Sequence, residues 1–119
     1  MTEPDDLAAM LPLPPATFHI LVALSDEDRH GYGIMREVAQ RTDGRARINT
    51  GTLYTTIQRL LDRHLIVEVE ERQDPADDER RRYYRLTATG RRLAQMELAR
   101  LSELVALGRH AGLAPSRKS

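Results

Sequence analysis

The stretch Ile48–Ile66, INTGTLYTTIQRLLDRHLI, predicts a helix that runs directly into a strand. Its apolar side chains recur at helical spacing and form one face: Leu53, Ile57, Leu60 and Leu61. The other face carries hydrogen-bond donors: Thr52, Thr55, Thr56, Gln58 and Arg59. Such donors suit base edges and phosphates, but the same pattern also fits an ordinary solvated helix face. We expect the helix from about Gly51 to Arg63, with Asn49 or Thr50 as its N-cap.

The bulk composition limits the classes of protein to which the chain can belong. Its 119 residues suffice for one domain, and its 18 basic and 18 acidic side chains cancel. An attraction to a polyanion must therefore come from local charge. The absence of cysteine excludes disulfides and zinc–thiolate sites. The four histidines are widely spaced, and no motif for a catalytic or phosphate-binding site is present, so we expect neither an enzyme nor a cofactor.

The chain shows no sign of membrane insertion or secretion. Its longest apolar run is Ile20–Leu24, whereas a membrane-spanning helix needs about 20 such residues. The first residues, MTEPDD, are acidic and unlike a secretory signal. We therefore expect a cytoplasmic protein.

Two further helices are expected before the opening stretch. The first starts at Pro14 or Pro15, which suit the first helical turn, and continues through ATFHILVAL to Leu24. The second runs from about Tyr32 to Arg41, after the break SDEDRHG and before TDGR. Gly31 and Gly33 are expected to permit a close backbone approach or a tight turn. Residues 1–13 form an N-terminal arm, either a short helix or a loosely docked segment.

After the opening stretch the pattern predicts a β-hairpin and then a long helix. LIVEVEE and RRYYRL are expected to be strands, joined by the loop RQDPADDER. A helix can then run from Thr87 to His110, and its apolar stripe exceeds what so small a domain can cover. We expect this helix, within residues 87–111, to pair with a second chain through Leu93, Ala94, Leu98, Leu101, Leu104 and Val105. Residues 112–119 are expected to be a disordered tail.

This order of elements is that of a mainly α fold with a β-hairpin, a winged helix-turn-helix domain over residues 14–86. In such a fold the third helix enters the DNA major groove and the hairpin is the wing, so the expected partner is double-stranded DNA. The candidate DNA contacts are Tyr32, Arg47, Thr50, Thr52, Tyr54, Thr55, Thr56, Arg59, Arg80, Arg81 and Arg82. Tyr32 and Tyr54 fit either a phosphate contact or core packing. The three wing arginines could instead neutralise the adjacent acidic residues 77–79.

Four motifs also carry a resemblance to a known family. FHILVAL, RHGYGIMREV, GTLYTTIQRLLDRHLI and RRRYYRLTATGRRLAQME resemble successive motifs of the PadR family of transcriptional regulators, in its smaller subgroup with one short C-terminal helix. The resemblance implies a homodimeric winged-helix repressor, joined through its C-terminal helices and released by a small molecule or another signal. A winged-helix module that binds proteins and not DNA is the alternative, favoured by the neutral charge and the acidic wing tip.

The chain departs from the family pattern in two ways. His64 stands where family members commonly have glycine between the third helix and the first strand. Histidine tolerates a left-handed backbone at some cost, so we expect the turn to be kept. The chain also lacks tryptophan, which multidrug-binding relatives can use to stack flat aromatic drugs, so the resemblance gives no basis for assigning that ligand class to this chain.

Overall fold

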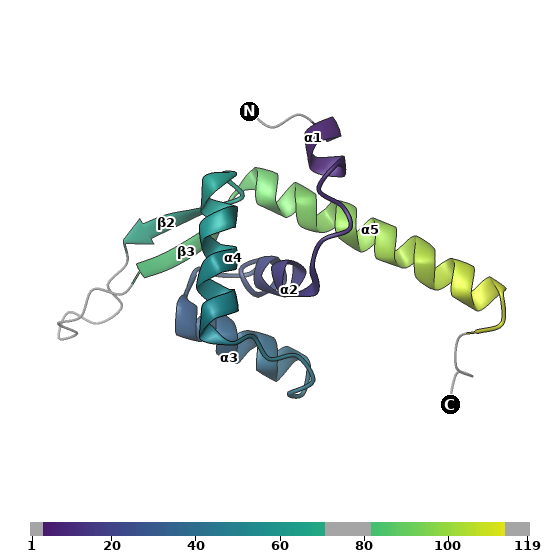
Figure 1. Ribbon diagram of the computed structural model, residues 1–119, viewed down its shortest axis with the longest axis horizontal. Helices are drawn as coiled ribbons and strands as arrows, with labels where there is room; N and C mark the ends of the chain where they lie inside the picture. The colour runs from purple at the N-terminus through teal and green to yellow at the C-terminus, as the bar shows by residue number, and fades with distance from the viewer. Residues whose placement is uncertain (1–3, 71–81, 114–119) are drawn as a thin grey trace.

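The computed structural model describes residues 4–70 and 82–113 and confirms the expected fold class (Figure 1). Its elements, in chain order, are α1 (Pro4–Ala8), α2 (Pro15–Ala23), β1 (Arg29–His30), α3 (Gly31–Arg41), α4 (Thr50–Asp62), β2 (Ile66–Glu70), β3 (Arg82–Leu86) and α5 (Ala88–His110). The expected wing loop and residues 114–119 of the expected tail lie outside the described residues. No helix in the described parts is long and apolar enough to cross a membrane.

The core lies where α2, α3 and α4 meet the start of α5 (Figure 1). The apolar face predicted for α4 is confirmed, since Leu53, Ile57 and Leu60 are buried there. They pack with side chains from the other elements: Leu7, Ile20, Leu21, Ile34, Val38, Leu65, Ile66, Tyr84 and Leu93. This packing leaves the opposite face of α4 uncovered by the rest of the described chain.

A strand that the sequence did not predict, β1, lies in the segment expected to be a break. It pairs antiparallel with β3, Arg29 opposite Tyr84 and His30 opposite Tyr83, so that the sheet has the order β1–β3–β2. A strand of two residues is too short to show an alternating pattern. The pairing joins the start of α3 directly to the middle of β3.

Side chains cap the N-termini of three helices. The Nδ1 atom of His30 accepts the Gly33 N–H at 3.0 Å, and the Thr87 hydroxyl accepts the Gly90 N–H at 3.0 Å. Asn49, one of the two residues expected to cap α4, accepts the Thr52 N–H at 2.8 Å. Each cap satisfies an N–H group that has no partner within its helix.

His64 keeps the turn after α4, as expected, with a left-handed backbone at φ 59°. Glycine has no Cβ atom and adopts this conformation without strain, whereas the Cβ atom of histidine makes it unfavourable. We therefore expect His64→Gly to raise the free energy of unfolding by about 0.5–1 kcal/mol. Urea unfolding followed by circular dichroism would measure the change. If His64→Gly instead lowered the free energy of unfolding, contacts of the imidazole would stabilise the protein by more than the strain destabilises it.

The N-terminal arm is a docked segment that includes the short helix α1. Leu7 is buried, and the Leu13 N–H donates to Oε2 of Glu97 at 3.1 Å. Glu97 is only 2% exposed and also accepts from Arg100, with Nε to Oε1 at 2.6 Å and Nη2 to Oε2 at 3.0 Å. Of the two alternatives for the N-terminal arm, the structure shows the short helix, over Pro4–Ala8.

Glu97 makes the stability of the arm dependent on pH. The Arg100 hydrogen bonds and the Leu13 N–H lower the pKa of Glu97, although burial opposes them. A lowered folded-state pKa gives stability that is complete at neutral pH and is lost as the pH falls through that pKa. We expect Glu97→Gln to cost about 1–2 kcal/mol at pH 7 and less at about pH 3. Urea titrations at both values test this, with the exposed Glu103→Gln on α5 as control.

The apolar stripe of α5 is divided between two environments. Leu93 is fully buried within its own chain, and Ala94 packs partly against the same core. The prediction that Leu93 contacts a second chain is therefore wrong, because the domain needs it to close its own core. Beyond this point Leu98, Leu104 and Val105 are each at least half exposed. Figure 1 shows this second half of α5 extending away from the other helices.

Candidate nucleic-acid interface

The predicted reading face of α4 is exposed with one exception. Thr50, Thr52, Thr55 and Arg59 are exposed, and so is Arg47 just before the helix. The side chains of Thr52, Thr55 and Arg59 make no hydrogen bond or ion pair to any other described residue. The face therefore offers hydroxyl and guanidinium groups that the described part of the chain does not use.

Thr56 is the exception, and its prediction as a DNA contact is wrong. Its side chain is only 8% exposed. Position 56 follows Leu53 by three residues and precedes Leu60 by four, which places it on the buried face. There it borders a cavity of about 230 Å³ between α4 and the N-terminal arm. A hydroxyl group alone therefore does not predict that a threonine side chain is exposed.

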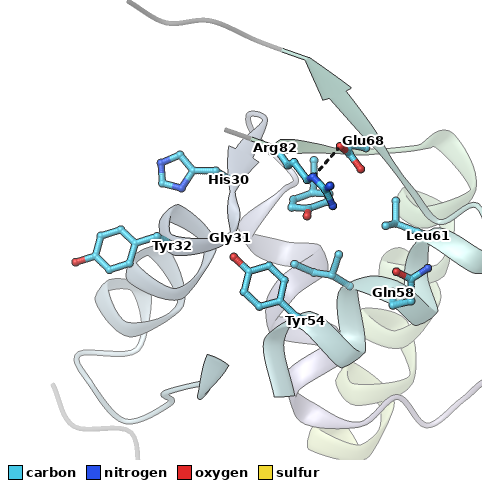
Figure 2. A pocket seen from close by; sticks show the side chains of 10 residues that line it. His30, Gly31, Tyr32, Tyr54, Gln58, Leu61, Glu68 and Arg82 are labelled. Carbon is cyan, nitrogen blue, oxygen red and sulfur yellow. Dashed lines mark ion pairs between the residues drawn. The ribbon is translucent and has the colours of Figure 1, made fainter. Parts of the chain in front are cut away.

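A pocket of about 600 Å³ lies beside α4, between this helix, the start of α3 and the hairpin (Figure 2). It is lined mainly by polar groups: His30, Gly31, Tyr32, Tyr54, Gln58, Glu68, Arg82 and Tyr84, with Ile57 and Leu61 as the apolar part. Burial raises the pKa of the Tyr84 phenol, and the neighbouring Glu68 carboxylate adds to the increase. Tyr84 therefore stays a neutral phenol in this wall.

Tyr54 lies directly against the backbone of Gly31. A Cβ atom at position 31 would be 2.3 Å from the Tyr54 hydroxyl oxygen, which is shorter than any real contact. Only glycine leaves room for this ring, which confirms the close approach expected at Gly31. Tyr54 remains 49% exposed, so its ring packs on one side and faces solvent on the other.

Tyr32, in the first turn of α3, is not a core residue. It is 60% exposed, its ring stacks on that of His30 with centroids 6.4 Å apart, and the Arg36 guanidinium lies 5.8 Å from its centroid. The packing alternative for Tyr32 is therefore ruled out. Its hydroxyl points away from the other residues that line the pocket (Figure 2).

The arginines near the wing differ in their surroundings. Arg82 is exposed and forms an ion pair of 3.6 Å with Glu68, while Arg85 forms a pair of 2.8 Å with Asp28. Arg80 and Arg81 lie outside the described residues, and so do the acidic residues proposed to neutralise them. The described hairpin thus presents one arginine, Arg82, at the pocket.

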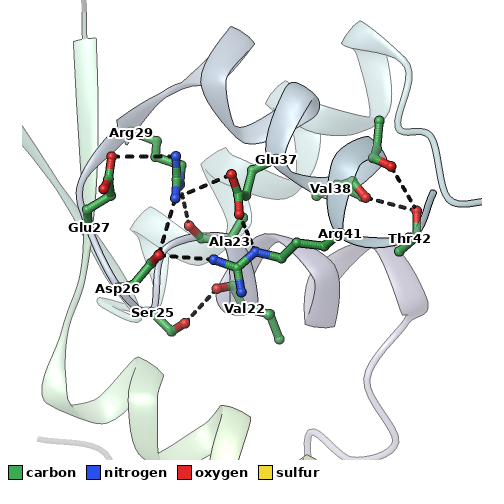
Figure 3. Close-up of polar contacts among 11 residues, drawn as sticks. Val22, Ala23, Ser25, Asp26, Glu27, Arg29, Glu37, Val38, Arg41 and Thr42 are labelled. Atoms are coloured by element: carbon green, nitrogen blue, oxygen red, sulfur yellow. Dashed lines mark hydrogen bonds and ion pairs between the residues drawn. The ribbon is translucent and has the colours of Figure 1, made fainter. Parts of the chain in front are cut away.

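Acidic residues of the segment before β1 are paired with arginines of β1 and α3 (Figure 3). Arg29 contacts Asp26 at 3.3 Å and Glu37 at 3.4 Å, and Arg41 contacts Asp26 at 3.1 Å as well as Glu37. These pairs link the turn after α2 to α3. Although the formal charge of the whole chain is zero, these acids do not offset the arginines beside α4.

The described residues contain no group of three or more histidine, aspartate or glutamate side chains that could hold a metal ion. The polar groups beside α4 include the His30 imidazole and the carboxylates of Glu68 and Asp62, but most are hydroxyls, an amide and guanidinium groups. Such groups recognise hydrogen-bonding edges and phosphates rather than metals.

The comparisons with known proteins agree with this arrangement. The family model of the transcriptional regulator PadR-like family matches residues 20–96. The chain belongs to this family. A curated protein of Lysinibacillus sphaericus, called uncharacterized protein X, is 37% identical over 86 residues, which are 72% of this chain and 71% of that protein.

Solved structures of transcriptional regulators, PadR proteins among them, share the fold. A transcriptional regulator from Clostridium thermocellum matches with a TM-score of 0.69 at 22% identity, over 92% of this chain and 97% of that one. A PadR family regulator from Clostridium difficile matches with a TM-score of 0.66 at 21% identity, over 82% and 97%. Bacillus subtilis PadR, solved in complex with operator DNA, matches with a TM-score of 0.63 at 20% identity, over 73% of this chain and 48% of that one.

Proposed function

We propose that this PadR-like protein binds operator DNA as a homodimer and acts as a repressor that a small molecule or another signal releases. The observation that carries the proposal is the exposed face of α4, on which the side chains of Thr52, Thr55 and Arg59 have no partner among the described residues. In a winged helix-turn-helix this helix enters the major groove. The operator complex of the Bacillus subtilis relative supports the same partner.

The homodimer rests on the second half of α5. Leu98, Leu104, Val105 and Leu107 are all at least half exposed, on a helix that extends beyond the core. Contiguous apolar side chains on a free helix are costly in water, and pairing with a second α5 would cover them. Two subunits would then place two α4 helices on one face of DNA, at half-sites about 10 base pairs, or a small multiple, apart.

DNA binding by the exposed face of α4 is tested in two steps. Sequences that the protein binds are selected from a pool of randomised duplexes, and the enriched sequence is then titrated. We expect a pseudo-palindrome whose log affinity falls linearly with log salt. Arg59→Ala should weaken binding by about 5- to 30-fold, since it removes a charge-assisted contact. Arg109→Ala removes the same charge from the last turn of α5 and should change affinity little.

Two results would contradict the proposal. Failure of the wild-type protein to enrich any sequence, together with no retention on heparin at low salt, would point to a protein partner for this face. Equal losses for Arg59→Ala and Arg109→Ala would mean that α4 is not the DNA-binding helix.

A further inference from the structure

Gln58 and Asp62 lie along the middle of the exposed face of α4. Together with Thr55 they are spaced at three and four residues, so they share one line on the helix, opposite the buried Leu53 and Leu60. Gln58 belongs to the hydrogen-bond donors expected on this face, but neither Gln58 nor Asp62 is among the candidate DNA contacts expected from the sequence. Their position makes them the part of α4 that is farthest from the core.

A hydrogen bond sets the orientation of the Gln58 amide. Its Nε2 donates to Oδ1 of Asp62 at 2.9 Å. An ionised carboxylate only accepts hydrogen bonds, so it holds the nitrogen end of the amide and rejects the flipped arrangement. One N–H is used in this bond. The second N–H and the carbonyl oxygen Oε1 are left without a partner among the described residues.

The remaining pair of groups fits one base. Adenine presents an acceptor, N7, beside a donor, the N6 amino group, in the major groove. The free N–H of Gln58 can donate to N7 while Oε1 accepts from N6. Guanine presents two acceptors at the same edge, and an amide held by Asp62 cannot offer two donors there.

We infer that Gln58 selects adenine at one position of each half-site and that Asp62 is the positioning residue that fixes its amide. The inference rests on the proposed function, because it requires α4 to enter the major groove. The competing explanation is a solvated side-chain pair that slightly stabilises the helix, as polar pairs at this spacing do. Such a pair would leave base preference unchanged when either residue is replaced.

The test compares base preference, and not affinity alone, among variants. Wild-type protein, Gln58→Ala, Asp62→Ala and the control Gln40→Ala are each taken through selection from a randomised duplex pool. Duplexes carrying each base pair at the assigned position are then titrated. Asp62→Ala also removes a negative charge and should strengthen binding to all sequences, so only the ratio between base pairs reports the role of Asp62.

We expect wild-type protein and Gln40→Ala to prefer one A·T pair per half-site by about 5- to 160-fold, the range for a good bidentate contact. Gln58→Ala should lose that preference at that position alone. Asp62→Ala should keep the operator but reduce the preference several-fold. Circular dichroism of each variant checks that the helix content is unchanged.

Other outcomes separate the two proposals. If the wild-type protein enriches no sequence, both the proposed function and this inference fail. If it enriches a palindrome and Gln58→Ala keeps every preference, only the inference fails. Loss of preference at a G·C pair would overturn the assignment of adenine. An unchanged ratio in Asp62→Ala would remove the positioning role.

Discussion

Leu98→Glu is expected to convert the protein to a monomer and to weaken operator binding by about 100-fold or more. Leu98 is 57% exposed on the part of α5 that extends beyond the core, so its replacement leaves the domain intact. In a dimer, the two new carboxylates would lose water and repel each other in an apolar contact. A monomer would also lose the gain in affinity that comes from binding two half-sites at once.

Sedimentation velocity at micromolar concentration and anisotropy titration with the selected operator measure the two effects. Ala99→Glu is the matched control, because it adds the same charge one residue along the exposed helix, about 100° around the axis. It should leave the dimer in place. A wild-type monomer, or a Leu98→Glu dimer of normal affinity, would contradict the role assigned to this stripe.

Gly90→Ala is expected to lower the free energy of unfolding by at least about 2 kcal/mol. Gly90 is in the first turn of α5, where a Cβ would lie 2.0 Å from the Leu65 carbonyl oxygen and 2.8 Å from Cδ1 of Leu86. The Leu65 carbonyl accepts both the N–H and the hydroxyl of Thr87, at 3.1 and 2.9 Å. Because the closest obstacle is backbone, α5 would have to move and these bonds would be strained.

Helix propensity alone predicts the opposite effect, because alanine stabilises a helix interior relative to glycine by about 1 kcal/mol. Gly108, also in α5, has nothing within 4 Å of its would-be Cβ. Gly108→Ala should therefore stabilise the protein slightly, while Gly90→Ala destabilises it. Urea unfolding of both variants makes the comparison. A similar gain in both would show that α5 adjusts its position at little cost.

The sequence was most informative where a pattern repeats. The helices α3 and α4 and both strands of the hairpin begin and end within about two residues of the predicted bounds, because each shows several turns or alternations of its period. The left-handed turn at His64 was also predictable, since it needs only local conformational preference. These features depend on neighbours in the chain.

The remaining features depend on contacts between distant segments. β1 exists because β3 offers it a partner, and the burial of Thr56 follows from the arm that packs beside it. The apolar side chains of α5 change from buried to exposed at Leu98, where the core ends. The apolar stripe continues past this residue, so the sequence alone does not reveal the change. The contact between Gly31 and Tyr54 likewise becomes visible only when two helices are brought together.

The pairing of β1 with β3 has a mechanical consequence for the DNA. Because Arg29 and His30 lead straight into α3, and Arg85 of β3 is paired with Asp28, β3 is tied to the helices at three successive residues. The fold therefore sets the distance between α4 and β3. A duplex whose grooves do not match must bend or twist to fit, and the energy of that deformation depends on its sequence. Base pairs that no side chain touches would then still influence how tightly the protein binds.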